Sequence, residues 1–448
     1  MNRVNIGTDL YLKGRIGWRG LSKNEYLNTG SYRIINATSL EDKFINWDIC
    51  GYITKERYDE SHEIQLKEKD ILISKDGTLG KIGYVKNLTS PSTVASGVFV
   101  LRNTKESIID TDYLYHFLKS NYFKFFISRI KAQGSTINHL YQRDLSQFTL
   151  EVPLLKTQKK IASVLSIIDD KIELNNKINT ELEKMAKTIY DYWFVQFDFP
   201  EKNGMPYKSS GGKMVRNEIL KRDIPEGWEV KTLDGCVEKI IDYRGKTPKK
   251  LGSDWSNNPN DFIALSAKHV KNGRLIDLQD ANRVDERLYN IWMKDHLKEG
   301  DILMTSEAPC GEFFYLMGKT NFCLSQRLFA IRANKEIVNH SYLYYELSSG
   351  NGFSQILGKV SGSTVFGIRQ DELRTVNILI PDKKLQMFFN EIATPVFQKI
   401  RNNDYQNQEL KELRDWLLPL LMNGQVVIKN VKELKNAPEI LQEFRKII

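Results

Sequence analysis

The chain contains a long internal repeat, and this repeat limits its fold more than any other feature of the sequence. The stretch GSTINHLYQRDLSQFTLEVP at 134–153 returns 228 residues later as GSTVFGIRQDELRTVNILIP at 362–381. The similarity continues without a gap, so that Gln158 returns as Gln386. A period this long is not that of a solenoid. We therefore expect two tandem copies of one domain, each of about 200 residues.

Each copy has two parts with different hydrophobic patterns. The front part contains short β-branched and aromatic runs such as SYRIIN, GKIGYV and GVFVLR, separated by residues typical of turns. The back part carries apolar residues three and four positions apart, which is typical of an amphipathic helix. We predict an α+β fold with a pseudo-two-fold internal repeat. Its expected parts are mixed α/β front domains at 1–153 and 225–381, a central helical region and connector at 154–224, and a C-terminal helical region and tail at 382–448.

The two predicted helices have apolar stripes that a lone helix cannot bury. Either each stripe packs on its own front domain, or the two stripes pack on each other as an antiparallel coiled coil. We expect the coiled coil, because Asn175 and Asn403 occupy the same position in both copies and a polar seam residue fixes the register of such a pair. The expected seam residues are Ile168, Ile172, Asn175, Leu182, Met185, Ile189, Val396, Ile400, Asn403, Leu410, Leu413 and Leu417.

Local signals suggest where the second helix begins and ends. Thr394 and Pro395 match an N-cap followed by proline at the first helical position, and Pro419 and Gly424 suggest the end. A helix of about 26 residues spans roughly 39 Å. Because each front domain precedes its helix, antiparallel packing would place the two front domains at opposite ends of a rod.

The sequence contains none of the common catalytic or metal-binding motifs. It has no phosphate-binding G-x-x-x-x-G-K-[ST], no G-x-G-x-x-G after a strand and no H-E-x-x-H. Four scattered cysteines argue against a zinc ribbon and fit a reducing cytoplasm. Asp382 with Glu409 and Lys411 matches a loose nuclease pattern, but Glu409 and Lys411 fall inside the predicted helix. We expect a non-catalytic cytoplasmic protein with no metal site, no cofactor of its own and no membrane span.

The net charge of +9 permits an anionic partner. Residues 1–150 carry five more basic than acidic residues, whereas 225–380 hold 20 of each. Basic segments with glycine at 14–26 and 241–250 suit nucleic acid, because Arg contacts guanine edges and Lys neutralises phosphates. The SKDG, SQR and GST segments lie on predicted loops. The candidate DNA-binding residues are Arg15, Trp18, Arg19, Lys75, Ser135, Thr136, Arg244, Lys246, Lys249, Gln326, Arg327, Ser363 and Thr364.

Several longer segments give the chain a resemblance to a known family. They are the connector at 197–230, DILISKDGTLGKIG at 70–83, LSQRLFAIR at 324–332 and QKKIASVLSIIDDKIELNN at 158–176. In these segments the chain resembles the specificity subunit of type I restriction–modification systems, and the resemblance covers nearly the whole length.

The resemblance implies a fold, a function and a set of partners. Two target recognition domains would each read one half of a split double-stranded DNA site, and the helices would hold them apart and carry two methyltransferase subunits. Two restriction subunits would join the larger complex, and S-adenosylmethionine, ATP and Mg would bind to the partner subunits. The alternative functions are a coiled-coil scaffold whose front domains bind protein, and a lone nuclease.

The two copies differ in ways that bear on this assignment. The second copy has SEAPCG at 306–311 where the first has SKDGTLG at 74–80, so the role of Lys75 does not transfer simply to Glu307. The first copy has no counterpart of IPEGWEV at 224–230, and we expect the C-terminal tail at 431–448 to complete its N-terminal edge. Different loops on matched scaffolds are what two different half-sites would require.

Overall fold

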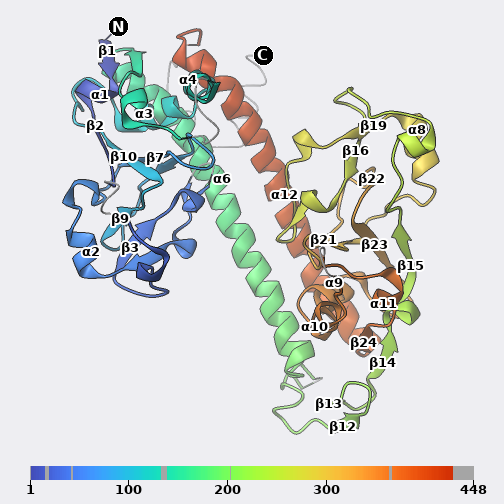
Figure 1. Cartoon of the computed structure of the whole chain (residues 1–448). Coiled ribbons are helices and arrows are strands. Elements are labelled where there is room, and N and C mark those ends of the chain that lie inside the picture. Colours follow the sequence, from blue (N-terminus) through green and yellow to red (C-terminus); the bar gives the residue numbers. More distant parts are fainter. Residues whose placement is uncertain are drawn as a thin grey trace. The chain divides into compact units, whose positions relative to one another are not determined.

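The computed structural model describes residues 2–15, 20–41, 44–132, 139–201, 203–362 and 366–426 (Figure 1). The chain forms two compact units, one from Met1 to Leu174 with the chain from Asn407 onward, and one from Asn175 to Gln406. Two long helices, α6 (Leu155–Tyr190) and α12 (Lys383–Met422), pass from one unit into the other. Each unit therefore contains one front domain and a part of both long helices.

The first unit is built on a four-stranded antiparallel sheet in the order β2-β10-β7-β8. A second sheet, β6-β3-β9, joins an antiparallel pair to a parallel pair. The elements are β1 (Asn2–Asn5), α1 (Ile6–Asp9), β2 (Tyr11–Gly14), β3 (Tyr32–Ile35), β4 (Leu40–Glu41), β5 (Phe44–Ile45), β6 (Gly51–Ile53), α2 (Lys55–Asp59), β7 (Ile71–Ser74), β8 (Ile82–Tyr84), β9 (Ser92–Val94), β10 (Val98–Arg102), α3 (Thr111–Leu118), α4 (Asn121–Ala132), α5 (Gln142–Leu145) and β11 (Thr149–Val152).

The second unit repeats this topology, with sheets in the orders β15-β23-β20-β21 and β19-β16-β22. A hairpin of β12 (Met214–Asn217) and β13 (Arg222–Pro225) precedes it. The remaining elements are β14 (Glu229–Thr232), α7 (Leu233–Cys236), β15 (Val237–Asp242), β16 (Phe262–Leu265), β17 (Val270–Lys271), β18 (Arg274–Leu275), β19 (Arg283–Val284), α8 (Glu286–Trp292), β20 (Ile302–Thr305), β21 (Phe313–Tyr315), β22 (Cys323–Leu324), β23 (Leu328–Ala333), α9 (His340–Ser348), α10 (Asn351–Gly358), α11 (Gln370–Arg374) and β24 (Asn377–Ile380).

The matching strand orders confirm the predicted α+β fold and its duplication. They also correct one detail of the first copy. β1 pairs with β11 as β14 pairs with β24, so the first copy has its own edge strand at Asn2–Asn5. The sequence comparison missed this strand because it shares almost no residues with Glu229–Thr232. The C-terminal tail at 431–448 lies outside the described residues.

Each helical stripe packs both on the other helix and on a front domain. In the first unit, Ile168 of α6 and Leu417 of α12 belong to the same buried cluster as Tyr113 of α3. In the second unit, Ala186 of α6 and Val396 of α12 share a cluster with the front domain. Within each unit, residues of both long helices therefore share one core with the front domain.

The inner face of α6 differs from the prediction at Met185, which is 46% exposed. The fully buried residues nearby are Asn179 and Ala186. Buried and half-buried positions follow 172, 175, 179, 182 and 186, alternately three and four residues apart, and Met185 falls outside this series. All the other predicted seam residues are buried or half-buried.

The predicted start of the second long helix was wrong. α12 begins at Lys383, where the Asp382 carboxylate accepts a hydrogen bond from the backbone N–H of Lys384 at 2.7 Å. Pro395 and Pro419 lie inside the helix, where each removes one backbone hydrogen bond without ending it. With 36 and 40 residues, α6 and α12 are about 54 and 60 Å long, so the estimate of 39 Å was too short.

Candidate nucleic-acid interface

The loops that follow β7 and β20 have the same backbone framework in the two units. In the first, the Lys75 N–H donates to the carbonyl of Gly97 at 2.9 Å, and the Lys75 carbonyl accepts from Leu140 N–H at 2.9 Å. In the second, Ser306 makes the same two bonds, donating to Arg327 and accepting from Ile368, both at 2.9 Å. Lys75 therefore corresponds to Ser306.

This correspondence assigns Glu307 to the position of Asp76. Asp76 lies against His139, with the carboxylate in contact with the ring Nδ1. Glu307 instead forms an ion pair with Arg327 at 3.0 Å. The two loops thus present different side chains on one backbone, and the role of Lys75 does not pass to Glu307.

Both units hold a cation over the same aromatic position of the central sheet. The Lys75 ammonium lies 4.9 Å from the ring centroid of Phe99 on β10. The Arg244 guanidinium lies 4.2 Å from that of Phe329, which holds the matching place on β23. The cation comes from the loop after β7 in the first unit and from the turn after β15 in the second. This convergence brings two predicted DNA-binding residues to equivalent places.

The neighbours of these two cations determine how each can act. Asp242 accepts two hydrogen bonds from the Arg244 guanidinium, at 2.9 and 2.8 Å, and fixes its plane. Burial lowers the pKa of Lys75, and Asp76 acts in the opposite direction. A fixed guanidinium suits recognition of a guanine edge, whereas the ammonium suits a phosphate.

The other predicted residues of the second unit are placed less uniformly. The Lys246 ammonium donates to the carbonyl of Trp292 at 3.0 Å and lies over Tyr243, and burial, with a contribution from Lys294, lowers its pKa. Lys249 is exposed in a short 3-10 helix. Gln326 and Arg327 are exposed immediately before β23.

Arg15 lies inside the first unit and is 3% exposed. Its guanidinium donates to the Val94 carbonyl at 3.1 Å and to the Ser61 hydroxyl at 3.3 Å, and burial lowers its pKa. In this position it stabilises the packing of the sheet rather than presenting charge to solvent. The remaining candidates lie outside the described residues: Trp18, Arg19, Ser135, Thr136, Ser363 and Thr364.

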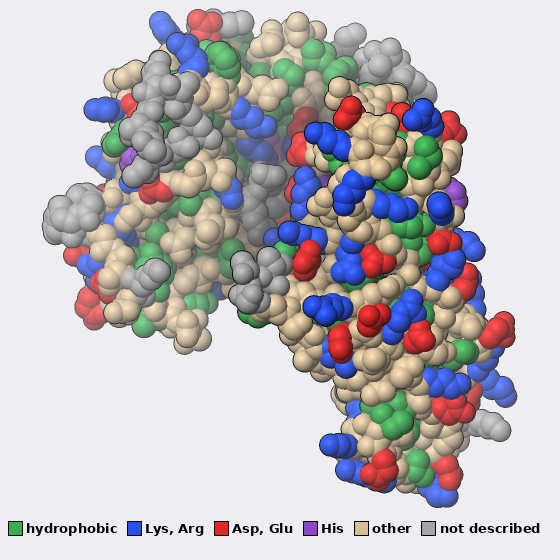
Figure 2. All heavy atoms as spheres, turned by 45° about the vertical axis from the view of Figure 1, so that its right-hand side comes forward, with side chains coloured by type: hydrophobic (Ala, Val, Ile, Leu, Met, Phe, Trp, Pro, Cys, Tyr) green, Lys and Arg blue, Asp and Glu red, His purple; other side chains and the backbone are tan. Residues whose placement is uncertain are grey.

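Sequence reasoning missed the residues that hold these side chains in place. Asp242, Phe99 and Phe329 are unremarkable within their strands, and only the pairing of β10 and β23 with their neighbours shows their role. The space-filling view shows Lys and Arg side chains interspersed with Asp and Glu on the face of the second unit that comes forward (Figure 2). This mixture agrees with the equal numbers of basic and acidic residues in 225–380.

The two long helices make side-chain hydrogen bonds to each other in the second unit and an ion pair in the first unit. In the second unit the Asn403 side chain donates to Asn179 at 2.7 Å, and Asn179 donates to Asp404 at 2.9 Å. In the first unit the Asp169 carboxylate accepts from Arg414 of α12 at 3.0 Å and from Lys119 after α3 at 3.3 Å. These bonds link both helices to each other and, through Lys119, to the first front domain.

Within the described ranges, no three His, Cys, Asp or Glu side chains are grouped as a metal site would require. None of the helices in those ranges combines the length and apolarity needed to cross a bilayer. Asp382 caps α12, whereas Glu409 and Lys411 lie far along the same helix, so the loose nuclease pattern is spread along one helix.

The model of one protein family, the type I restriction modification DNA specificity domain, matches this chain twice, at residues 17–184 and 225–413. The two matches follow the two copies of the repeat and cover most of the chain. The chain belongs to this family. Its relatives are therefore specificity subunits, and the sequence resemblance is confirmed.

Individual members support this assignment. The chain is 28% identical over 377 residues to the MjaIX specificity subunit of Methanocaldococcus jannaschii, covering 82% of each protein. It is 23% identical over 455 residues to the HindI specificity subunit of Haemophilus influenzae, covering 90% of this chain and 94% of that one. The crystal structure of the S subunit from M. genitalium has the same fold, with a TM-score of 0.54 and 15% identity over 94% of this chain and 95% of that one.

Proposed function

We propose that this member of the specificity family is a non-catalytic DNA reader, in which each front domain recognises one half of a bipartite site. The observation that carries the proposal is the shared backbone of the loops after β7 and β20, which presents Lys75 in one unit and Ser306 in the other. A common frame with different side chains suits two half-sites of different sequence. Affinity would come from contacts with phosphates, and specificity from a few contacts with base edges.

We further propose that α6 and α12 form an antiparallel coiled coil that sets the distance between the half-sites. The inner positions of both helices alternate by three and four residues, which is the pattern of a coiled-coil seam. In the second unit, Asn175 contacts Gln406 and Asn179 contacts Asp404. Residue numbers therefore increase along α6 while those of the contacting residues on α12 decrease, as in an antiparallel pair. The domain boundaries at 153, 224 and 381 follow from this organisation.

The outer faces of the helices would carry the partner subunits. Met387, Tyr405 and Trp416 of α12 are 55%, 63% and 43% exposed, and exposed apolar side chains are common at protein interfaces. Two methyltransferase subunits would supply S-adenosylmethionine and flip the target base. Two restriction subunits would bind ATP and Mg.

Sequencing the modified bases of cells that carry this chain with its methyltransferase tests the proposal. We expect one split motif with a fixed spacer. A continuous motif, or no modification that depends on this chain, would refute it.

A protein-binding scaffold is the second candidate, and the balanced charge of 225–380 favours it. Binding of the purified chain to random duplex DNA across a range of salt concentrations separates the two. Release of counterions gives a steep loss of affinity with salt for a DNA reader, whereas a scaffold binds DNA weakly at every salt concentration.

A further inference from the structure

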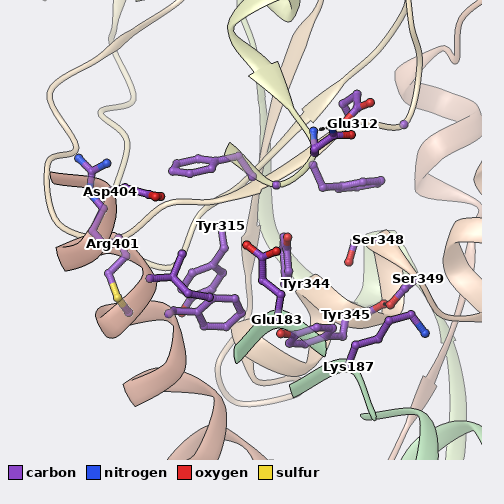
Figure 3. Close-up of a pocket in the computed structure, with 18 residues that line it drawn as sticks. Glu183, Lys187, Glu312, Tyr315, Tyr344, Tyr345, Ser348, Ser349, Arg401 and Asp404 are labelled. Atoms are coloured by element: carbon purple, nitrogen blue, oxygen red, sulfur yellow. Dashed lines mark hydrogen bonds between the residues drawn. The ribbon is translucent and has the colours of Figure 1, made fainter. Parts of the chain in front are cut away.

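The second unit contains a cavity of about 300 Å³ between its front domain and the long helices (Figure 3). Its walls come from α6, α9, α12 and β21, and include Tyr315, Tyr344 and Phe397. Clefts from about 300 Å³ upward can hold a small ligand. The cavity lies in one unit, and Gly311 and Glu312 at the end of the loop after β20 form part of its lining.

The matching place in the first unit is filled by a cation. There the Lys119 ammonium lies 4.8 Å from the ring centroid of Tyr115 and 3.3 Å from the Asp169 carboxylate. Arg414 binds the other oxygen of Asp169 at 3.0 Å. The first unit thus holds an ammonium group between an aromatic ring and a carboxylate.

The second copy keeps the aromatic ring at Tyr344 but lacks the charged side chains. DYLYHFLKSN at 112–121 aligns with SYLYYELSSG at 341–350, so Tyr115 corresponds to Tyr344 and Lys119 to Ser348. The repeat of 228 residues makes Phe397 the counterpart of Asp169 and Ala186 the counterpart of Arg414. Of these replacements, Ser348 lines the cavity and is much smaller than Lys119, whereas Phe397 adds a ring to the wall.

Two carboxylates reach the cavity of the second unit from positions that do not correspond to Asp169. Figure 3 shows Glu183 pointing into the cavity beside Tyr344, while Glu312 lies on the opposite side. Arg274 bonds only Oε1 of Glu183, at 2.7 Å, and Glu312 accepts the Asn272 N–H at 2.7 Å through Oε2. Among the described residues, the second oxygen of each carboxylate accepts no hydrogen bond, so it can serve as an acceptor toward the cavity.

One of the two basic residues of the lining is paired with a carboxylate. Lys187 forms an ion pair with Asp191 one turn further along α6. Arg401 lies beside Asp404 on α12, away from Ser348 and Ser349 (Figure 3). With Arg274 counted, the lining and its ion-pair partners hold four carboxylates and three cations, which favours a cationic occupant.

We propose that this cavity binds an aliphatic diamine or polyamine. One ammonium group would occupy the place that Lys119 holds in the first unit, between Tyr344 and Glu183, and a second would lie against Glu312. The methylene chain would pack on the aromatic side chains between them. Ammonium groups over aromatic rings and beside carboxylates gain both cation–π and charge-assisted hydrogen bonds.

Titration calorimetry of the full chain with putrescine and spermidine tests the proposal. We expect saturable binding at one site, and none of the uncharged analogue 1,4-butanediol. Ser348→Lys places the ammonium of the first unit into the second and should weaken putrescine binding at least about tenfold, a loss of about 1.4 kcal/mol. Because Phe397 stands where the first unit has Asp169, a melting curve of Ser348→Lys separates loss of the site from unfolding.

A matched pair of charge variants locates the site. Glu183→Gln should weaken binding, whereas Glu181→Gln, on an exposed carboxylate of the same helix, should leave it unchanged. Absence of saturable binding at millimolar putrescine overturns the proposal. So does unaltered binding by Ser348→Lys, or an equal effect of the two glutamate variants.

Discussion

The Asp169 carboxylate should be among the most sensitive single positions for the stability of the first unit. Its side chain is 6% exposed and accepts hydrogen bonds from Lys119 and Arg414, which are themselves only 11% and 12% exposed. Asp169→Asn keeps the shape but leaves two buried cations without their shared anion. Breaking a buried ion pair on one side costs about 3–5 kcal/mol. We expect a loss of this size, because Asp415, the carboxylate that still pairs with Arg414, is 65% exposed.

The neighbouring residue provides a matched control. Asp170 is 60% exposed and pairs with Lys86 at 3.3 Å on the surface. Asp170→Asn should change stability by less than about 1 kcal/mol. Denaturant unfolding of the full-length variants, followed by circular dichroism, measures both. If Asp169→Asn were no more destabilising than Asp170→Asn, the proposed buried cluster linking α3, α6 and α12 would be wrong.

Three further predictions concern Lys119, the cations Arg244 and Lys75, and the pair Asn179 and Asn403. Burial lowers the pKa of Lys119 to about 8, below its ordinary value of 10.5, so the unfolded state binds more protons between these values and stability should rise with pH from about 8 to 10. Lys119→Met should remove this rise in a pH series of melting temperatures. Arg244→Ala should reduce discrimination against wrong bases at one half-site by about 1–3 kcal/mol, and Lys75→Ala should weaken binding at the other half-site. Base-modification sequencing measures both effects. Loss of recognition at both half-sites from one variant would count against separate readers. Replacing Asn179 and Asn403 together by Leu should raise thermal stability while loosening register, and a less stable double variant would contradict a seam role for this pair.

The repeat made the duplicated topology predictable, because an equal spacing over a long stretch requires equal folds. It also made the inner helix positions largely predictable. The error at Met185 arose because the seam residue was chosen by its hydrophobicity and not by its spacing. Met185 is the larger apolar residue, but Ala186 continues the alternation of three and four residues. Likewise Asn179 is fully buried, because its amide finds partners on α12.

The site was harder to predict than the fold. Aligning Ser74 with Ser306 by identity shifts the loop by one residue, whereas strand pairing matches Ser74 with Thr305. Gly80 and Gly311 both have positive φ, and their N–H groups donate to the carbonyls of Ser74 and Thr305. These bonds fix the same register. Arg15 resembled a surface cation, but the sequence could not show that Val94 and Ser61 would enclose it.

Lengthening the two long helices tests the central claim most directly. Seven residues inserted into the middle of both α6 and α12 preserve the inner pattern and add about 10.5 Å, or about three base pairs at 3.4 Å each. Base-modification sequencing of cells carrying the variant and its methyltransferase should show a spacer about three base pairs longer, with both half-site sequences unchanged. An unaltered spacer, or altered half-sites, would contradict the account.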